Sequence, residues 1–289
     1  MAPWRQDRTY HPVAAECPLC PTRPGQPETE IPEPDYHIAV FENRFPSYTG
    51  DQGRCEVVCY TPDHDSSLGA QPLEQIRDLV DVWQDRLAEL SRLAGVRYVF
   101  IFENRGEVIG VTLSHPHGQI YAYPFLPPVP QRELRASARH WRKTGRCLYC
   151  DLLAGELGGE RRVVENQHWL AFVPAFARWP YEVHLAPREH RGSLLELTEA
   201  EADAFAAALK ELLQRYDALF SFPLPYVMAM HQRPPGRGHR HAHLHVEFYP
   251  PNRSADKLKY LAGSELGAGA FILDARAEDT AKRLRELAI

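Results

Sequence analysis

The sequence has no long hydrophobic run and no excess of basic residues. No stretch of the chain approaches the ~18 consecutive apolar residues that a membrane-spanning helix needs. Lys and Arg together number 33, against 38 Asp and Glu, and the formal net charge is -5. This balance argues against broad, charge-driven binding to nucleic acid but leaves a small phosphorylated ligand open. Because the polar N-terminal segment has no apolar segment behind it, we expect a soluble, cytoplasmic protein that binds no membrane.

Cysteine is also scarce, and most of the few cysteines lie in closely spaced pairs. Six cysteines in 289 residues are too few for a disulfide scaffold. Four of them form two Cys-x-x-Cys pairs, Cys17 with Cys20 and Cys147 with Cys150. Neither pair opens a helix directly after a strand, as a thioredoxin-like redox site would, so the pairs indicate metal binding.

The chain can bury a core and is long enough for two units. Hydrophobic residues make up 44% of it, as in ordinary globular proteins. At about 150 residues per domain, the length fits two domains or one domain built from two similar halves. Histidine is abundant, with 14 copies, and many of these lie in two short runs, one around residues 115–117 and the other at 239–245.

Superimposing the two histidine runs reveals an internal duplication. At an offset of 126 positions His115 aligns with His241, His117 with His243, and Gln119 with His245. The match extends upstream, because a histidine ends a strand-like segment 51 residues before each run, as His64 and His190. A helix-like stretch lies between these histidines in each half, and each half begins with its Cys-x-x-Cys pair.

The shared order predicts an α+β fold made of two tandem units. Each unit has an antiparallel sheet with a long helix packed on it, and the two sheets can fuse into one. We place the first unit at residues 1–130 and the second at 131–289. The proline-rich stretch and the basic segment after it mark the junction.

The duplicated positions predict two tetrahedral metal sites. Two thiolates and two imidazoles are a normal structural zinc set, and the same four residue types recur in the same order. The predicted ligands are Cys17, Cys20, His64 and His115 in the first half, and Cys147, Cys150, His190 and His241 in the second. Cys55 and Cys59, four apart in a predicted strand, are expected to lie in the core.

If His115 binds metal, His117 is left free for chemistry. A neutral imidazole is a competent nucleophile toward phosphorus near neutral pH. Gly118 follows it and leaves room for a ligand, and Gln119 can donate a hydrogen bond.

These motifs resemble a known family. Phe102-Glu-Asn-Arg-Gly followed by His115-Pro-His-Gly-Gln-Ile-Tyr-Ala is similar to the signature of the galactose-1-phosphate uridylyltransferases, a branch of the histidine-triad superfamily. Cys17-Pro-Leu-Cys, Thr61-Pro-Asp-His, Trp179-Pro-Tyr-Glu and Lys259-Tyr-Leu-Ala-Gly-Ser-Glu extend the resemblance over nearly the whole chain.

The resemblance implies a double-displacement reaction through a covalent uridylyl-histidine. His117 would attack the α-phosphorus of UDP-glucose, and galactose 1-phosphate would then accept the uridylyl group. Glutamine at position 119, where histidine-triad hydrolases have histidine, would not pass a proton to water. A UDP-sugar and a sugar 1-phosphate are the implied ligands, zinc is the implied cofactor, no organic cofactor is expected, and a homodimer is implied.

The resemblance also implies roles for individual residues. Asn43 and Asn104 would contact the nucleotide, and Thr112 and Ser114 would contact the phosphates, with Ser114 beside the catalytic pair His117 and Gln119. Arg5 and Arg8 would bind the uridine diphosphate, and Lys259 and Glu265 would reach the sugar phosphate, across a dimer interface.

A second metal site in well-known members uses one glutamate and three histidines. His231 and His245 match two of these positions, Glu247 stands where a third histidine is usual, and Arg139 and His140 occupy the region of the glutamate.

Three alternatives remain. A nucleoside-diphosphate-sugar or dinucleotide phosphorylase would keep His117 and Gln119 and use free phosphate as acceptor. A histidine-triad hydrolase would use His243 as nucleophile with the aid of His245. A zinc-stabilised module without turnover would bind RNA through the arginine-rich loop at residues 233–240, although no aromatic residues interleave with these arginines.

Overall fold

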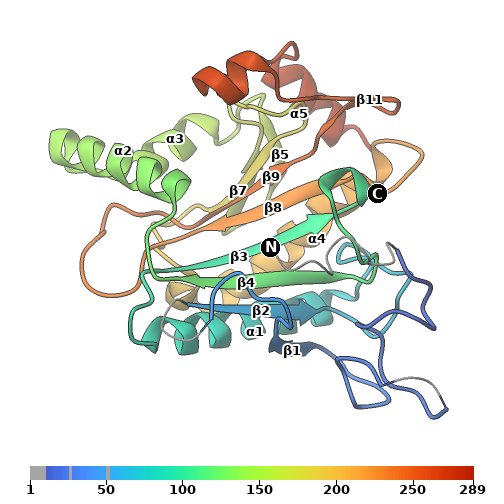
Figure 1. Ribbon diagram of the computed structural model, residues 1–289. Helices are drawn as coiled ribbons and strands as arrows, with labels where there is room; N and C mark the ends of the chain where they lie inside the picture. The colour runs from blue at the N-terminus through green and yellow to red at the C-terminus, as the bar shows by residue number, and fades with distance from the viewer. Residues whose placement is uncertain (1–10, 26–27, 50–52) are drawn as a thin grey trace.

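The computed structural model describes residues 11–25, 28–49 and 53–289, and its centre is a nine-stranded antiparallel sheet (Figure 1). The predicted α+β class is confirmed. The strands of the sheet are β1 (Ala39–Glu42), β2 (Arg54–Cys59), β3 (Tyr98–Arg105), β4 (His117–Tyr123), β5 (Arg162–Glu165), β6 (Trp169–Phe172), β7 (Val183–Pro187), β8 (Tyr226–His231) and β9 (His245–Tyr249). The helices are α1 (Leu73–Arg92), α2 (Pro128–Thr144), α3 (Leu148–Glu156), α4 (Glu199–Ala218) and α5 (Ala277–Arg285), with short helical turns η3 (Glu107–Ile109), η4 (Leu194–Glu196) and η5 (Ser264–Ala268). A small hairpin, β10 (Asn252–Ser254) and β11 (Lys257–Leu258), follows β9.

The strand order joins the two halves into one sheet. The order is β1-β2-β4-β3-β8-β9-β7-β6-β5, with β3 and β8 paired in the middle from Ile101↔Met230 to Arg105↔Tyr226. The first half contributes β1 to β4 on one side of this pair, and the second contributes β5 to β9 on the other. The boundary predicted at residue 130 falls in the first turn of α2 and remains a prediction.

The internal repeat is real, but its offset is 128 at the histidine runs and not 126. Nδ1 of His117 lies 2.7 Å from the carbonyl oxygen of His115, and Nδ1 of His245 lies 2.9 Å from that of His243. His245 is therefore the counterpart of His117. The sequence alignment was wrong by two residues because histidine alternates from 239 to 245, and a two-residue slip keeps every side chain on the same face of a strand.

Two long helices cover one face of the sheet. α1 and α4 are the helices predicted between the paired histidines, and α4 begins with a capping box in which Thr198 and Glu201 bond each other's backbone. Trp83 of α1 lies 6.4 Å from Phe205 of α4, and that ring stacks on Trp169 of β6 at 4.4 Å. All three are fully buried, so the two halves share one core.

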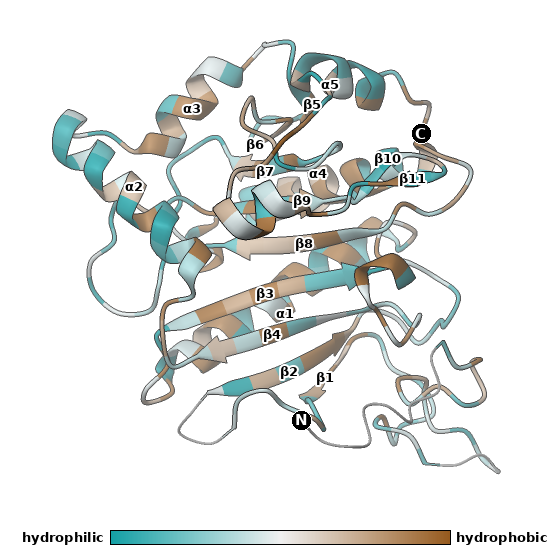
Figure 2. Cartoon of the chain, turned by 45° about the horizontal axis from the view of Figure 1, so that its top comes forward, coloured by the Kyte–Doolittle hydropathy of each residue, from teal (hydrophilic) through white to brown (hydrophobic). Residues whose placement is uncertain are grey.

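The opposite face is covered differently in the two halves. Over the first half, an irregular segment packs Cys17, Leu19 and Ile31 against Val57 and Cys59, two residues of β2. Cys55 and Cys59 are both fully buried, as expected from the sequence. Over the second half lie α2 and α3, at the edge of the molecule in Figures 1 and 2. The basic junction is thus a helix, α2, which Figure 2 colours as mostly hydrophilic.

No helix in the described part of the chain combines the length and the apolar character needed to cross a bilayer.

A buried carboxyl group ties the two halves together on the helix-covered face. The hydroxyl of Tyr226 on β8 donates to Oε2 of Glu103 on β3, at 3.2 Å, and Arg105 contacts Asp217 of α4 at 2.6 Å. Burial raises the pKa of Glu103 to about 7, although Arg105 opposes the shift. The folded protein therefore binds a proton here that the unfolded chain releases near pH 4.5.

This raised pKa predicts a pH-dependent stability. Between pH 4.5 and 7 the folded state holds more protons at Glu103 than the unfolded state, so stability falls as pH rises through this range and then levels. Replacing Glu103→Gln keeps an acceptor for Tyr226 and removes the ionisation. The difference in free energy of unfolding between the variant and wild type should be more favourable to the variant at pH 8 than at pH 5, by on the order of 2 kcal/mol. Urea unfolding at both pH values measures this, with the exposed Glu107→Gln as control. An unchanged pH dependence in Glu103→Gln would refute the assignment.

Candidate active site and metal groups

Alternation along β4 sorts its side chains between the two faces of the sheet. Gly118, Ile120 and Ala122 are buried against the helices, while His117 and Gln119 face the opposite side. In a strand, residues two apart point the same way, so the pattern His-Gly-Gln brings the predicted nucleophile and the predicted hydrogen-bond donor to one surface.

The backbone selects the tautomer of His117. Its Nδ1 lies 2.7 Å from the carbonyl oxygen of His115, an acceptor, so Nδ1 carries the proton and Nε2 keeps its lone pair. Burial of the ring lowers the pKa of His117, against the effect of this hydrogen bond, so the ring is neutral at pH 7. A neutral imidazole with a free Nε2 has the form required of a nucleophile.

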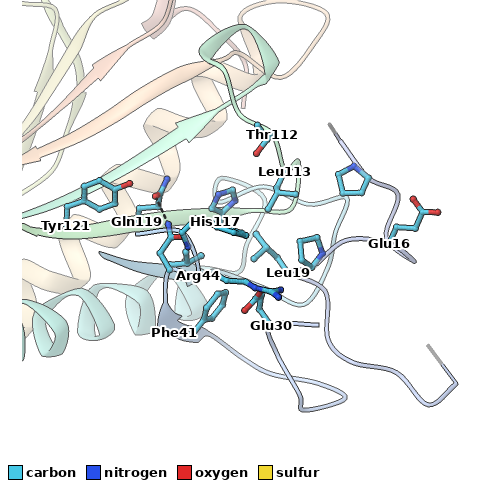
Figure 3. A pocket seen from close by; sticks show the side chains of 15 residues that line it. Glu16, Leu19, Glu30, Phe41, Arg44, Thr112, Leu113, His117, Gln119 and Tyr121 are labelled. Carbon is cyan, nitrogen blue, oxygen red and sulfur yellow. Dashed lines mark hydrogen bonds and ion pairs between the residues drawn. The ribbon is translucent and has the colours of Figure 1, made fainter. Parts of the chain in front are cut away.

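A cavity of about 640 Å³ opens over this part of the sheet (Figure 3). His117 and Gln119 lie at its wall, and the amide of Asn43 donates to Oε1 of Gln119 at 3.4 Å. This contact leaves the NH₂ group of Gln119 available to a ligand. The predicted nucleotide and phosphate contacts Asn43 and Thr112 both line the cavity. The other lining residues are Pro12, Glu16, Pro18, Leu19, Glu30, Phe41, Arg44, Phe45, Val57, Leu113 and Tyr121.

The cavity combines an apolar wall with few cations. Leu19, Phe41 and Val57 offer a surface for a flat ring. Arg44 is the one Lys or Arg among the described lining residues, and its Nη1 lies 3.1 Å from Oε1 of Glu30. Arg5 and Arg8, the predicted diphosphate ligands, lie outside the described residues.

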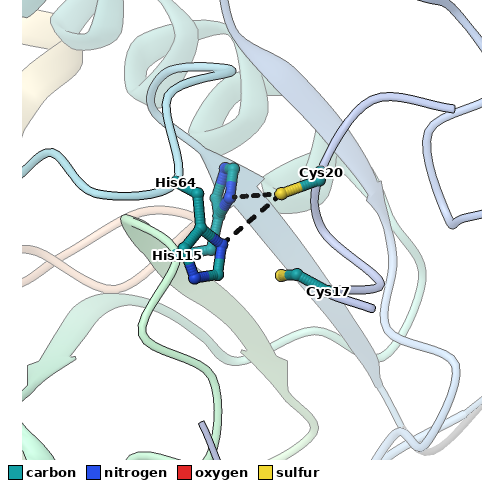
Figure 4. A group of neighbouring side chains, drawn as sticks. All are labelled: Cys17, Cys20, His64 and His115. Atoms are coloured by element: carbon teal, nitrogen blue, oxygen red, sulfur yellow. Dashed lines mark hydrogen bonds between the residues drawn. The ribbon is translucent and has the colours of Figure 1, made fainter. Parts of the chain in front are cut away.

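Four side chains of the first half converge as the repeat predicted (Figure 4). The ligand atoms of Cys17, Cys20, His64 and His115 lie within 4.8 Å of one another, and all four residues are buried. We call this set the first thiolate group. Burial beside Cys17 raises the pKa of Cys20 to about 12, so the thiolate form needs a bound cation. Two sulfurs and two imidazole nitrogens match a structural zinc ion.

The second half has an equivalent set, with one change from the prediction. Cys147, Cys150, His190 and His243 bring their ligand atoms within 4.8 Å of one another. We call this set the second thiolate group. His241 is not part of it and offers Cys147 only its backbone carbonyl, at 3.9 Å from Sγ. The prediction of His241 was wrong for the same reason as the offset, since its counterpart in the first half lies two residues before His115.

The corrected offset also removes His243 as a nucleophile. Its Nδ1 lies 3.6 Å from Sγ of Cys147 and 3.5 Å from Sγ of Cys150, and its Nε2 lies 3.0 Å from the carbonyl of Pro187. Both nitrogens of this ring are occupied, so the hydrolase alternative with His243 has no free imidazole nitrogen.

A third set of ligand atoms lies beside the second thiolate group. Glu133, His231, His245 and Glu247 place one ligand atom each within 4.8 Å of the others. We call this set the carboxylate group. Glu133 comes from α2. The family resemblance places the glutamate ligand of this site near positions 139 and 140, which hold Arg139 and His140. Glu133 escaped the sequence analysis because helical periodicity in the basic junction went unrecognised.

Other predicted site residues lie away from the cavity. Lys259 is buried, and its Nζ lies 3.2 Å from Oε1 of Glu265, while neither residue lines the cavity of His117. Oγ of Ser114 lies 3.2 Å from Nε2 of His64, and the structure gives it no contact with His117. Asn104 lies on β3 two residues beyond Phe102, which pairs with Gln119, and this register places it opposite His117.

Gly118 has a structural reason other than the one expected. A Cβ atom at this position would lie 2.1 Å from the hydroxyl of Tyr60 and 3.1 Å from the carbonyl of Phe102. Tyr60 belongs to the core beneath α1 and α4, so the glycine makes room for a buried tyrosine and not for a ligand. The Tyr60 hydroxyl has no hydrogen-bond partner among the described residues.

Comparison with known proteins agrees with this geometry. Residues 47–127 match the family model of the galactose-1-phosphate uridyl transferase N-terminal domain, and residues 133–289 match that of the C-terminal domain. The chain is 47% identical to the galactose-1-phosphate uridylyltransferase of Streptomyces lividans, over 89% of this chain and 82% of that one. It is 42% identical to the enzyme of the same name from Thermotoga maritima, over 97% and 92%.

Solved structures show the same fold. A structure described as a uridylyltransferase superposes with a TM-score of 0.87 at 37% identity, over 96% of this chain and 92% of that one. An ADP-glucose phosphorylase from Arabidopsis thaliana has the same fold, with a TM-score of 0.82 at 23% identity over 100% and 95% of the two chains.

The fold and the site define a protein of two similar α+β halves on one antiparallel sheet, with a neutral histidine facing a cavity in the first half. Within that class, the chain belongs to the galactose-1-phosphate uridylyltransferase family.

The contact between Gly118 and Tyr60 predicts a double-mutant result. Gly118→Ala should lower stability by about 1–3 kcal/mol, because its methyl group overlaps the tyrosine hydroxyl. Tyr60→Phe alone should cost little, because the hydroxyl it removes is buried without a partner. In the double variant the phenylalanine should restore part of the loss. Urea unfolding of the four proteins tests this, and strictly additive effects would show that the two side chains do not meet.

Proposed function

We propose that this protein transfers UMP from UDP-glucose to galactose 1-phosphate through a covalent uridylyl-histidine at His117. The observation that carries the proposal is a neutral His117 whose Nε2 is free and whose neighbour Gln119 presents its amide NH₂ to the same cavity. The names of the relatives, at 42–47% identity over most of their length, support a uridylyl group as the group transferred and galactose 1-phosphate as the acceptor.

In the first step Nε2 of His117 attacks the α-phosphorus of UDP-glucose. A nitrogen–phosphorus bond forms, the bond from that phosphorus to the bridging oxygen of glucose 1-phosphate breaks, and the sugar phosphate leaves. The positive charge that develops on the ring is stabilised by the carbonyl of His115, which holds the Nδ1 proton. In the second step a phosphate oxygen of galactose 1-phosphate attacks the same phosphorus and releases His117.

Gln119 would stabilise charge on the non-bridging oxygens. Its Oε1 accepts from Asn43, so its NH₂ group is directed at the ligand in both steps. An amide does not take up a proton near neutral pH, so Gln119 does not activate water against the uridylyl intermediate. Thr112, at the cavity wall, would add a hydroxyl donor.

The diphosphate needs more positive charge than the described lining supplies. Arg44 is paired with Glu30, and Glu16 adds a further negative charge. Following the resemblance, we assign Arg5 and Arg8 to the diphosphate, with Asn43 and Asn104 toward the nucleoside. Ser114 is assigned to the support of His64 and not to contact with the reacting phosphate.

Zinc at the first thiolate group would have a structural role. A zinc ion would hold the His115 backbone, and its carbonyl sets the tautomer of His117. Nε2 of His115 lies 2.8 Å from the carbonyl of Thr61, which fixes the ring with Nδ1 toward the cysteines. A second zinc ion at Cys147, Cys150, His190 and His243 would fit the same way.

Following the resemblance, we assign Lys259 and Glu265 to the sugar phosphate of a second copy in a homodimer; in their own chain they pair with each other and do not line the cavity of His117.

The covalent step predicts a mass increase. Brief incubation with UDP-glucose and no acceptor should add one uridylyl group to the wild-type chain, measured by intact-protein mass spectrometry. His117→Ala should gain nothing, because the nucleophilic nitrogen is removed. The surface variant His37→Ala, whose ring pairs with Asp78, should label like wild type. Labelling of His117→Ala would overturn the assignment.

The same labelled protein identifies the acceptor. Galactose 1-phosphate should discharge the adduct as UDP-galactose, whereas discharge by inorganic phosphate alone would favour the phosphorylase alternative.

Loss of zinc from the first thiolate group should slow uridylylation of His117, although the metal would not contact the reacting atoms. In Cys17→Ser/Cys20→Ser, zinc content should fall by about one ion per chain, and the rate of labelling should drop by at least ~10-fold because His115 is no longer held. Cys55→Ser, which alters a buried cysteine outside the three groups, should keep its zinc. Normal zinc content in the double variant would exclude this site.

A further inference from the structure

The two ligand groups of the second half share one short piece of β9. His243 belongs to the second thiolate group, His245 belongs to the carboxylate group, and Nδ1 of His245 lies 2.9 Å from the carbonyl oxygen of His243. This contact gives His245 the tautomer with a free Nε2, directed at Glu133, His231 and Glu247. A cation that holds His243 therefore also holds the carbonyl that orients His245.

Tyr149 makes a second link between the groups. It lies between the two cysteines of the second thiolate group, and its ring stacks on His245 at 4.2 Å and lies 5.4 Å from His243. Its hydroxyl lies 2.6 Å from Nδ1 of His184, and Nε2 of that ring lies 3.0 Å from Oε1 of Glu182 and 3.4 Å from Oε1 of Glu247. Closure of the Cys147–Cys150 turn on a metal ion thus positions a ring that stacks on one ligand, His245, and through His184 contacts the neighbouring carboxylates of Glu182 and Glu247.

The helices on this face add a third link. Glu133 reaches the carboxylate group from α2, and His140 of α2 lies 2.6 Å from Asp151 of α3, one residue after Cys150. Nδ1 of His231 lies 2.8 Å from Glu133, but neither it nor Nε2 of His245 has a hydrogen bond of normal geometry in the described structure. Both residues are at least nine-tenths buried, so these nitrogens await a partner.

The first half lacks this arrangement. At the positions of His245 and Glu247 it carries His117 and Gln119, and its cysteine turn contains Pro18 and Leu19, which have no polar atom to offer from their side chains.

We propose that the second half is a coupled two-cation unit, in which a thiophilic ion such as Zn²⁺ at the second thiolate group promotes binding of a divalent ion that prefers oxygen and nitrogen, such as Mn²⁺, at the carboxylate group. Tyr149 is the positioning residue between them. The donor sets select different cations, because two sulfurs favour zinc and two carboxylates with two imidazoles favour harder ions.

The test measures Mn²⁺ affinity by electron paramagnetic resonance of free Mn²⁺, on full-length protein given one Zn²⁺ for each cysteine pair. Cys147→Ser/Cys150→Ser should weaken Mn²⁺ binding by about 10–100-fold, the usual effect of removing support behind metal ligands. The matched variant Cys17→Ser/Cys20→Ser should bind Mn²⁺ like wild type, because no contact among the described residues links the first thiolate group to the carboxylate group. Equal Mn²⁺ affinity in the two double variants would overturn the proposal.

Tyr149 variants keep the test valid if the double serine variant fails to fold. Tyr149→Ala leaves all eight ligands of both groups in place and should weaken Mn²⁺ binding about 10-fold. Tyr149→Phe loses only the bond to His184 and should have a smaller effect. Wild-type Mn²⁺ affinity in Tyr149→Ala would show that the ring carries no coupling.

A reciprocal effect of the two ions on each other's affinity distinguishes coupling between the sites from a general loss of structure in the variants. If Zn²⁺ at the second thiolate group raises Mn²⁺ affinity by a given factor, saturating Mn²⁺ must raise Zn²⁺ affinity there by the same factor. Competition with a zinc chelator, with and without Mn²⁺, measures this. A Zn²⁺ affinity that does not respond to Mn²⁺ would refute the coupling, even if every variant lost metal.

Discussion

One hydrogen bond, from Nδ1 of His117 to the carbonyl of His115, governs the reactive centre. It decides which nitrogen carries the proton, and so which one can attack phosphorus. The acceptor is a backbone atom of a residue whose own ring points into the first thiolate group. The position of the nucleophile therefore depends on the folding of the segment that contains Cys17 and Cys20, although that segment is far from His117 in sequence. The metal ligand His115 lies two residues before the nucleophile His117, which is the first residue of β4. The stability of the metal group therefore affects the position of the nucleophile.

The second half keeps this hydrogen bond and changes what surrounds it. His245 bonds the carbonyl of His243 as His117 bonds that of His115. Where the first half has Gln119, the second has Glu247, and opposite His245 lies His231 at the place of Asn104. Under the two proposals, the exchange of two neutral amides for a carboxylate and an imidazole replaces donors to a phosphate by ligands for a cation. Both halves thus keep the hydrogen bond from a histidine Nδ1 to the backbone carbonyl two residues earlier, and the side chains around it differ between the halves.

Much of this could be predicted from the sequence, and the failures have physical causes. Helical spacing predicted α1 and α4, and the repeated histidine pattern predicted His115 beside the cysteines with His117 left free. The pairing of His190 with His243 could not be settled, because alternating histidines fit a strand equally well in two registers. α2 was not predicted, because a proline-rich start followed by many basic residues resembles a linker. Glu133, which lies on α2, was not predicted for the same reason. The role of Gly118 depends on Tyr60, whose approach from the other side of the sheet no local pattern reveals.

The unequal covering of the sheet completes the division between the halves. Double displacement needs a cavity from which one sugar phosphate leaves before another enters, and the cavity of about 640 Å³ over β4 is walled by loops. The equivalent face of the second half lies beneath α2 and α3, and the cavity there is about 360 Å³. Helices packed over a site hold its ligands firmly and slow the exchange of large molecules, which suits a bound cation and would hinder two sugar phosphates in turn. The covering layer, together with the residues exchanged on β8 and β9, therefore suits the proposed turnover to the first-half centre and a bound cation to the second.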